Sequence, residues 1–295
     1  MRRHQPERDD VAAIGDRRGG RPAGRPAVIA SFRQRYGEWA VVTGASSGIG
    51  EAFAHALAAR GVRPLLVARR EDELRRVAAA VQQRHGVECG WLALDLADPA
   101  FIERLAEACA GREVGLVIGN AAHNPAGAFL DLPREALLRT LDVNDRANLL
   151  LAHAFLPAFK ARGRGGLLLV GSTEGYSGSP YSACYSASKA FVLSFGEALW
   201  GELRGSGVDV LVLVPNATDT PLLASRNVGA RKIRGMSAPA VAQTGLDHLG
   251  KGPSVVPGPL NRWTFRVLRR LPRKWLVQAV GGAMRRIVVD MQRQA

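Results

Sequence analysis

The chain has 295 residues, of which 47% are hydrophobic and 22% are charged, as in an ordinary globular protein with a sizeable core. Its formal net charge of +14 lies at the two ends, with +5 in residues 1–36, +8 in residues 260–295 and only +1 in residues 37–259. A neutral middle excludes a nucleic-acid-binding core, so no nucleic acid is expected as a partner.

The cysteines and histidines indicate neither a disulfide framework nor a metal site. The three cysteines are unpatterned, and the six histidines lack the spacing of metal ligands. Few cysteines suit a reducing compartment, so we expect a cytoplasmic protein without a bound metal. No apolar run reaches the ~18 residues of a membrane-spanning helix.

Residues 1–36 are expected to form a disordered basic tail. Residues 1–30 are rich in Arg, Gly, Pro and Asp and hold few large apolar side chains. They also lack the unbroken apolar run of a signal peptide.

From Trp39 onward, apolar runs of strand length alternate with Ala-, Leu- and Arg-rich segments of helical length. Strands are expected at 39–43, 63–68, 91–94, 115–119, 167–171 and 208–214, and helices at 50–60, 71–85, 99–110, 134–162 and 185–204. This alternation predicts an α/β fold, a single doubly wound Rossmann-type domain over residues 37–259 with a parallel sheet between helical layers. The unbroken apolar runs predict strands that are buried on both faces.

The first predicted strand leads into a glycine-rich turn and then a helix. The turn reads Thr43-Gly44-Ala45-Ser46-Ser47-Gly48-Ile49-Gly50. Its glycines permit a tight turn and a close approach to a pyrophosphate, and the helix N-terminus adds N–H groups and a positive dipole end. A dinucleotide site is therefore expected, with a generic glycine-rich turn as the alternative.

A second motif carries acid–base chemistry. Tyr185 and Lys189 are four residues apart, and Ser172 lies thirteen residues before Tyr185. Positions i and i+4 share a helix face, so the Lys189 ammonium group would lie beside the Tyr185 phenol and favour its ionised form. Tyr185 could then serve as a general acid or base, while Ser172, at a neighbouring strand end, would hold a substrate oxygen.

Together, T-G-x-x-x-G-x-G and a serine followed by Y-x-x-x-K resemble the pattern of the short-chain dehydrogenase/reductase family. The similarity covers about residues 37–225, and residues 36–44 look like the ketoacyl- and ketosteroid-reductase branch. The resemblance implies catalytic roles for Ser172, Tyr185 and Lys189, with Tyr185 and Lys189 also at the cofactor. It further implies a homo-oligomer.

The resemblance implies more cofactor contacts. The pyrophosphate would be bound by Gly44, Ser46, Ser47, Gly48, Ile49 and Gly50. Asp95 resembles the residue at the adenine edge, and Asn120 resembles the residue beside the adenosine ribose. Asn144 resembles the catalytic helix asparagine that holds a water linking the lysine to a proton relay; a buried asparagine at a helix kink is the alternative.

Residues 215–220 stand where the family has P-G-x-V-x-T, the loop that receives the nicotinamide carboxamide. The implied contacts come from Pro215, Thr218 and Thr220. Asn216 replaces the family's glycine. Because Asn tolerates a positive φ better than most residues, the turn is expected to persist.

The end of the second predicted strand favours NADP(H) over NAD(H). Ala68 takes the place of the acidic residue that would accept the ribose 2′-hydroxyl group of NAD. Arg69 follows, and a guanidinium group suits the 2′-phosphate of NADP. The alternative is that Arg69 and Arg70 face water at the strand end.

The segments after the cofactor loop are expected to have other roles. By resemblance, residues 221–240 form a mobile substrate lid. Residues 260–295 predict a basic amphipathic helical extension, with helices on either side of Pro272. This extension suits peripheral contact with an anionic membrane surface, or packing on the domain or on a second subunit.

We therefore expect an NADP(H)-dependent oxidoreductase that interconverts a ketone and a secondary alcohol. The substrate is a small, lipophilic molecule of acyl, steroid or retinoid type. Two alternatives remain, a membrane-associated cofactor-binding scaffold with vestigial catalysis, and epimerase or dehydratase chemistry on the same fold. The Tyr185–Lys189 pair argues against the scaffold, and the short stretch beyond Thr220 argues against the second alternative.

Overall fold

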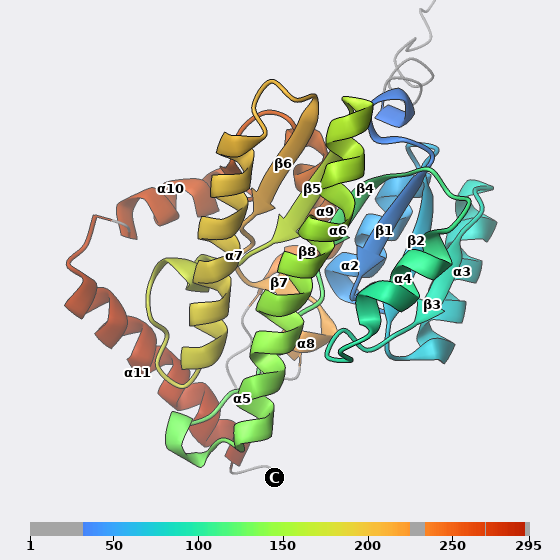
Figure 1. Cartoon of the computed structure of the whole chain (residues 1–295). Coiled ribbons are helices and arrows are strands. Elements are labelled where there is room, and N and C mark those ends of the chain that lie inside the picture. The colour runs from blue at the N-terminus through green and yellow to red at the C-terminus, as the bar shows by residue number, and fades with distance from the viewer. Residues whose placement is uncertain (1–31, 225–233, 269, 293–295) are drawn as a thin grey trace, which may run out of the picture.

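Seven parallel strands form the central sheet, in the order β3-β2-β1-β4-β5-β6-β9 (Figure 1). The computed structural model describes residues 32–224, 234–268 and 270–292. The strands are β1 (Trp39–Thr43), β2 (Arg63–Ala68), β3 (Gly90–Ala93), β4 (Val114–Gly119), β5 (Gly165–Val170), β6 (Val208–Leu213) and β9 (Ser254–Val255). The strand order reverses between β1 and β4, so the carboxyl ends of these strands open a crevice at that point.

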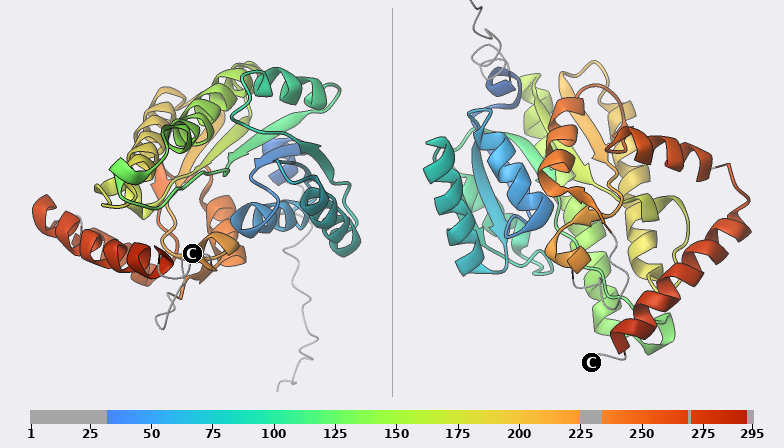
Figure 2. Two further views of the ribbon diagram at one scale, coloured as in Figure 1. Left: turned by 90° about the horizontal axis from the view of Figure 1, so that it is seen from below. Right: turned by 180° about the vertical axis from the view of Figure 1, so that it is seen from behind.

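Helices cover both faces of the sheet (Figure 2). One face carries α2 (Gly48–Ala58), α3 (Glu71–His85) and α9 (Ala238–His248), and the other carries α4 (Phe101–Cys109), α6 (Ala147–Arg162) and α7 (Ala183–Glu202). Further α-helices are α5 (Arg134–Leu141), α8 (Pro221–Ala224), α10 (Pro259–Leu268) and α11 (Arg273–Gln292). The predicted single doubly wound domain with a C-terminal helical extension is confirmed.

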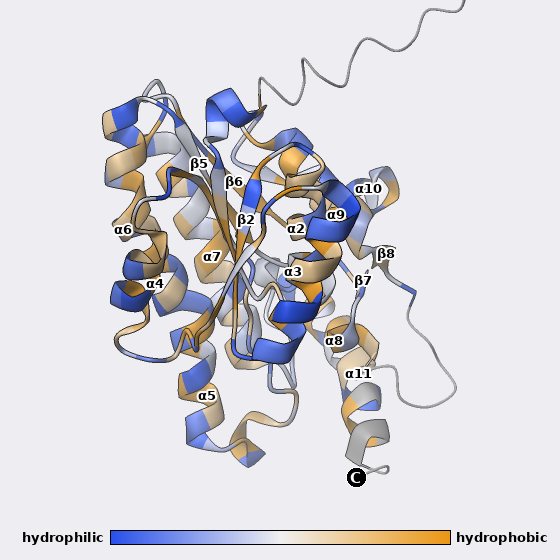
Figure 3. Cartoon of the chain, turned by 90° about the vertical axis from the view of Figure 1, so that its right-hand side faces the viewer, coloured by the Kyte–Doolittle hydropathy of each residue, from blue (hydrophilic) through white to orange (hydrophobic). Residues whose placement is uncertain are grey.

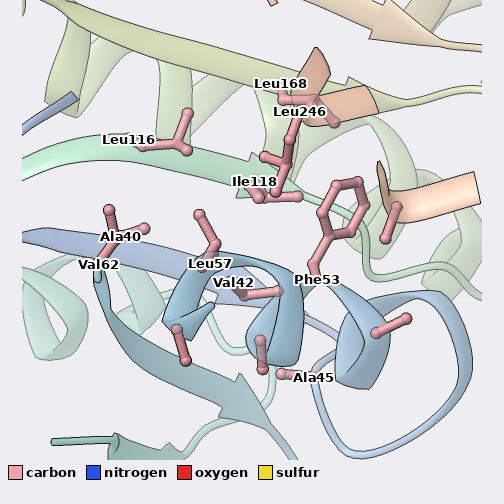
Figure 4. Close-up of a cluster of buried hydrophobic side chains, with 14 of the residues drawn as sticks. Ala40, Val42, Ala45, Phe53, Leu57, Val62, Leu116, Ile118, Leu168 and Leu246 are labelled. Atoms are coloured by element: carbon pink, nitrogen blue, oxygen red, sulfur yellow. The ribbon is translucent and has the colours of Figure 1, made fainter. Parts of the chain in front are cut away.

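The core lies in two layers because alternate residues of each strand point to opposite faces. On one face, Ala40 and Val42 of β1 pack with Phe53 of α2, and all three are fully buried (Figure 4). On the other face, Val41 belongs to the cluster that contains Phe101 of α4. Burying a phenylalanine side chain contributes about 2 kcal/mol. In Figure 3, hydrophilic colour marks the outward sides of the helices and hydrophobic colour follows the strands.

The segment 134–162, predicted as one helix, is not a continuous α-helix. Between α5 and α6, residues Asp142–Arg146 form a π-helical turn, named η2. A π turn accommodates one extra residue and is common at functional sites. Here it holds Asn144 in the interior of the protein.

The predicted disordered tail over residues 1–36 includes residues that are ordered in the structure. Residues 32–36 are helical, and Tyr36 is buried. Its hydroxyl group donates a hydrogen bond to Asp209 of β6 (2.7 Å), and Arg35 forms an ion pair with the same carboxylate (2.6 Å). These contacts tie residues 32–36 to the sheet, so the prediction is wrong for them; residues 1–31 lie outside the described part of the chain.

Within the described ranges, no helix has the length and apolar character needed to cross a bilayer.

Candidate active site

A cavity of about 570 Å³ lies at the carboxyl ends of the parallel strands. Of the predicted site residues, the cavity is lined by Gly44, Ser46, Ser47, Gly48, Ile49, Arg69, Asp95, Asn120, Ser172, Tyr185, Lys189, Pro215, Thr218 and Thr220. Gly50 and Asn144 are the two predicted residues that do not line it. The fold therefore brings segments that are far apart in the sequence to one place.

The glycine-rich turn forms a tight cradle between β1 and α2. Gly44 and Gly48 have φ values of 65° and 62°, which L-residues rarely adopt. A Cβ atom on Gly44 would lie 2.8 Å from Ala121 Cα, and a Cβ atom on Gly50 would lie 2.3 Å from Gly44 O. Gly50 thus allows the close packing of α2 on the turn instead of lining the cavity.

The N-terminus of α2 opens onto this cradle. Ser47 is its N-cap residue, has an extended backbone and makes no side-chain capping bond to the first turn. The first N–H groups of the helix therefore lack that partner, and they lie at the positive end of the helix dipole. This arrangement fits a pyrophosphate group.

Two arginines lie at the end of β2. Arg69 and Arg70 are exposed and both line the cavity. Arg70 donates hydrogen bonds to the hydroxyl groups of Ser46 (3.0 Å) and Ser47 (3.2 Å). The strand-end spacing indicates Arg69 alone, because spacing does not show that Arg70 reaches across to the glycine-rich turn.

The end of β3 and the end of β4 supply two further cavity residues. Asp95 pairs with Arg139 (2.6 Å) and accepts a hydrogen bond from Ala97 N (3.0 Å). Burial opposes ionisation of Asp95, but these hydrogen bonds outweigh it and lower the pKa of the carboxyl group. Asn120 uses its side-chain amide to bond Thr43 O at 2.9 Å, which ties β4 to β1.

Tyr185 and Lys189 face the cavity from α7, and both are buried. The Lys189 Nζ atom lies 5.6 Å from the Tyr185 ring centroid and donates a hydrogen bond to Val170 O at 2.8 Å. Burial lowers the pKa of Lys189 to about 8, against the opposing effect of the carboxylates of Asp145 and Glu174. The distance of 5.6 Å places the ammonium group beside the phenol, as the spacing predicts.

Ser172 follows β5 at the cavity wall. Its hydroxyl oxygen accepts a hydrogen bond from Glu174 N (3.1 Å) at the start of η3 (Thr173–Tyr176). A hydroxyl group that accepts one hydrogen bond can still donate its own proton. Ser172 is thus fixed in place with a donor for a reacting oxygen.

Asn144 lies behind this wall, fully buried in η2. Its side chain accepts a hydrogen bond from His123 N (2.8 Å) and donates to His123 O (3.0 Å) and to Ser188 Oγ (2.8 Å). The Asn144 carboxamide is therefore hydrogen-bonded to protein groups. It joins the segment after β4 to the turn of α7 that precedes Lys189.

The loop after β6 does not have the conformation expected of it. Among the described residues, only Tyr181 has a positive φ outside glycine, so Asn216 does not use the left-handed region. The turn instead closes through side chains: Thr218 Oγ1 donates to Asn216 O (2.9 Å), and Thr220 Oγ1 donates to Thr218 O (3.2 Å). The explanation based on positive φ is therefore wrong.

Only parts of the predicted lid over 221–240 are described. Residues 221–224 form α8, and α9 begins at Ala238, which is buried. Residues 225–233 lie outside the described ranges.

Met284 at the cavity and Asp145, which does not line it, are two residues of interest that the motifs do not indicate. Met284 of α11 lines the cavity, so the C-terminal extension contributes to its wall. Asp145, next to Asn144, is partly buried, and its Oδ1 atom has no hydrogen-bond partner among the described residues. Burial raises the pKa of Asp145 to about 6, although Lys189 acts in the opposite direction. No sequence signal marks Asp145, while the apolar stripe of residues 276–291 could have drawn attention to Met284.

The family model described as "short chain dehydrogenase" matches residues 38–230. The chain belongs to this family. It is an oxidoreductase, and the predicted resemblance is confirmed.

Individual members of the family resemble the chain over most or part of its length. A 7β-hydroxysteroid dehydrogenase of Collinsella aerofaciens is 33% identical over 239 residues, which cover 79% of this chain and 90% of that protein. A very-long-chain 3-oxoacyl-CoA reductase of Laccaria bicolor is 36% identical over 186 residues, or 62% of this chain and 55% of the reductase. A solved short-chain dehydrogenase from Sphingobium yanoikuyae, in complex with NADPH, has 30% identity and a TM-score of 0.69 and covers 77% of this chain and 91% of its own.

Proposed function

We propose that the protein is an NADP(H)-dependent oxidoreductase that interconverts a ketone and a secondary alcohol. The observation that carries this proposal is the fully buried Lys189 ammonium group beside the Tyr185 phenol in a cavity that also contains the glycine-rich cradle. When bound, the nicotinamide supplies or accepts a hydride. The protein's own task is then to bind the substrate and move one proton.

Each residue of the cavity wall has a distinct task in this proposal. The Tyr185 hydroxyl group gives a proton to the carbonyl oxygen, or takes one from the alcohol. Lys189 favours the phenolate form of Tyr185 through its positive charge and contacts the nicotinamide ribose. Ser172 donates a hydrogen bond to the reacting oxygen. Asn144 positions α7, and a water beside it would complete the proton relay.

We assign the remaining predicted contacts to the cofactor. The cradle would hold the pyrophosphate, Asp95 and Asn120 would hold the adenosine, and Pro215, Thr218 and Thr220 would hold the carboxamide. Arg69 and Arg70 border the cavity where Ala68 leaves no carboxylate to repel a 2′-phosphate. NADP(H) is therefore favoured over NAD(H).

The substrate end of the cavity supports a lipophilic ketone. Its wall includes the apolar side chains of Val143, Leu222, Leu223 and Met284. The relatives named above are a hydroxysteroid dehydrogenase and a 3-oxoacyl-CoA reductase, both named for lipid-type compounds. We propose a steroid, acyl or retinoid type of carbonyl substrate.

A fluorescence experiment tests this function. NADPH is first mixed with the protein, and the change in nicotinamide fluorescence reports binding. A panel of steroid, acyl and retinoid ketones is then added, with small polar ketones as the matched control. We expect loss of fluorescence with at least one lipophilic ketone. Binding of NADPH without consumption by any carbonyl compound would contradict the proposal.

We also propose a homo-oligomer. Leu138, Leu141 and Leu149 on α5 and α6 are exposed by 53%, 45% and 42%. Exposed leucines on two consecutive helices support a protein–protein contact. Light scattering after size-exclusion chromatography should give a mass of at least two chains, and Leu138→Ser with Leu149→Ser should reduce it.

A further inference from the structure

Helices α10 and α11 project from the body and meet at a corner away from the sheet (Figures 1 and 2). Their inner side is anchored. The Phe265 ring lies 4.2 Å from the Tyr176 ring, measured between centroids, and Met284 and Val288 are buried. A Cβ atom on Gly281 would lie 2.9 Å from Pro180 Cγ, so α11 closely approaches the loop before α7. This pair of helices, here named the arm, is therefore a packed part of the molecule.

The arm also carries large apolar side chains that no described residue buries. Of twelve exposed large hydrophobic residues in the described ranges, five lie between residues 260 and 275. They are Leu260, Trp263, Val267, Leu271 and Trp275. Trp263 and Trp275 are exposed by 65% and 64%, which is unusual for the largest apolar side chain. Such a concentration marks an interaction surface.

The same segment is strongly basic. Residues 260–295 carry nine Lys or Arg residues and one acidic residue. The exposed cations among them include Arg266, Arg270, Arg273, Lys274, Arg285 and Arg286. None of the salt bridges found in the described parts of the chain involves a cation of the arm. Their charge is therefore not neutralised within those parts.

The positive charge of the arm distinguishes between the possible binding partners of this surface. A symmetric contact between two arms would bring +8 against +8, which like-charge repulsion disfavours. Packing on the body of a second copy would find a nearly neutral partner, because residues 37–259 carry only +1. An anionic lipid surface fits both kinds of side chain. Tryptophan prefers the boundary between headgroups and acyl chains, and arginine is attracted by the negative charge of the lipids.

We propose that the arm docks the protein on an anionic membrane surface, with Trp263 and Trp275 at headgroup level and the arginines on the lipid phosphates. The helix that contributes Met284 to the cavity would then also touch the bilayer. A lipophilic ketone dissolved in the membrane would thus reach the cavity beside this helix. That last step rests on the function proposed above, whereas the docking itself does not.

Vesicle co-sedimentation of the full-length protein tests the docking without any enzyme assay. The probes are phosphatidylcholine vesicles with and without about 30 mol% phosphatidylserine. We expect at least about tenfold more protein in the pellet with the anionic vesicles, and a loss of this binding at about 0.5 M salt. Tryptophan emission should shift to shorter wavelength on binding. Equal pelleting with both kinds of vesicle, or none, would overturn the proposal.

Matched variants separate the arm from the rest of the surface. Arg266→Glu with Arg270→Glu, and Trp263→Ser with Trp275→Ser, should each reduce anionic-vesicle binding about tenfold. Leu130→Ser and Arg134→Glu change residues that are comparably exposed but lie outside the arm, and they should bind as the unchanged protein does. NADPH binding checks that each variant is folded. If the tryptophan variant instead converts a dimer to a monomer while vesicles bind nothing, a second copy covers the arm and the proposal is wrong.

Discussion

The Lys189 ammonium group lies 5.6 Å from the Tyr185 ring centroid and is held there by a 2.8 Å hydrogen bond to Val170 O. Val170 ends β5, one of the central strands, so the sheet fixes the position of the cation. A buried charge costs free energy unless it has partners, and here the opposing carboxylates are Asp145 and Glu174. The protein thus holds a positive charge in its interior, beside a phenol, at the wall of a cavity.

Tyr185→Phe should remove turnover and spare cofactor binding. The substitution deletes only the hydroxyl group, and general acid–base catalysis contributes roughly 10²–10⁴-fold to a rate. We expect the rate of NADPH oxidation with a ketone substrate to fall by at least about a hundredfold, while the Kd for NADPH changes less than about threefold. Stopped-flow absorbance and fluorescence titration measure the two quantities. A variant that retains a tenth of the rate would refute the role of Tyr185.

Arg69→Ala and Arg70→Ala should each weaken NADPH binding much more than NADH binding. A charge-assisted hydrogen bond to phosphate is worth about 1.5–3 kcal/mol, which corresponds to about tenfold or more in Kd. Arg75→Ala, an exposed residue of α3 that pairs with Glu71, serves as the control. Isothermal titration with both cofactors makes the comparison. If both variants lose affinity for NADH as strongly as for NADPH, these arginines do not select the phosphate.

Much of the fold could be predicted from local patterns. The strands β1 to β6 are mostly apolar, although β2 begins with Arg63 and β6 contains Asp209. The predicted helix over 71–85 coincides with α3 because an acidic first turn and Gly86 bound it. Strand β9 was missed because Ser254 and Val255 are too short a segment to show any periodicity. The helical residues 32–36 were missed because their stability comes from Asp209, which is 173 residues away from Tyr36 in the sequence.

The functional site, like the fold, could be predicted only in part from the sequence. The residues of the two motifs meet at one cavity because parallel strands share their carboxyl ends. Arg70, Met284 and Asp145 depend on contacts between distant segments, which neither spacing nor composition encodes. The positive φ expected at Asn216 is wrong for a related reason. The backbone avoids a positive φ there, and the hydroxyl groups of Thr218 and Thr220 close the loop.

Asp145→Asn should stabilise the protein above about pH 6. Burial raises the pKa of Asp145 from its usual 3.8 to about 6, so the folded state binds this proton more tightly than the unfolded state does. The unchanged protein therefore loses stability as pH rises from about 4 through 6, and a neutral amide avoids that loss. Because the side chain is partly exposed, and because the amide also removes a carboxylate that opposes the buried charge of Lys189, we expect a gain of only about 1 kcal/mol at pH 7.

Urea unfolding at several pH values checks this expectation for Asp145. The difference in unfolding free energy between Asp145→Asn and the unchanged protein should be near zero at pH 4 and should grow to its full value above pH 6. The control is Asp142→Asn, one turn earlier, whose carboxylate pairs with Arg146. That variant should not gain stability with rising pH. A pH-independent difference for Asp145→Asn would show that its effect comes from packing and not from the proton.

Gly50→Ala should damage both the fold and the cofactor cradle. The new Cβ atom would lie 2.3 Å from Gly44 O, a backbone atom that can retreat only if α2 moves away from the turn. We expect a loss of about 2 kcal/mol in unfolding free energy, because overpacking of this kind typically costs about 1–3 kcal/mol. NADPH affinity should fall by at least about tenfold, since the first turn of α2 shifts with it.

Gly201→Ala is the matched control for Gly50→Ala. Gly201 also lies in a helix, α7, but a Cβ atom there would meet nothing within 4 Å. Alanine has a higher helix propensity than glycine by about 1 kcal/mol, so this variant should be as stable as the unchanged protein or more so, with the same affinity for NADPH. Thermal unfolding and fluorescence titration of the two variants side by side make the comparison. Equal behaviour of the two would mean that α2 does not need its close approach to the glycine-rich turn.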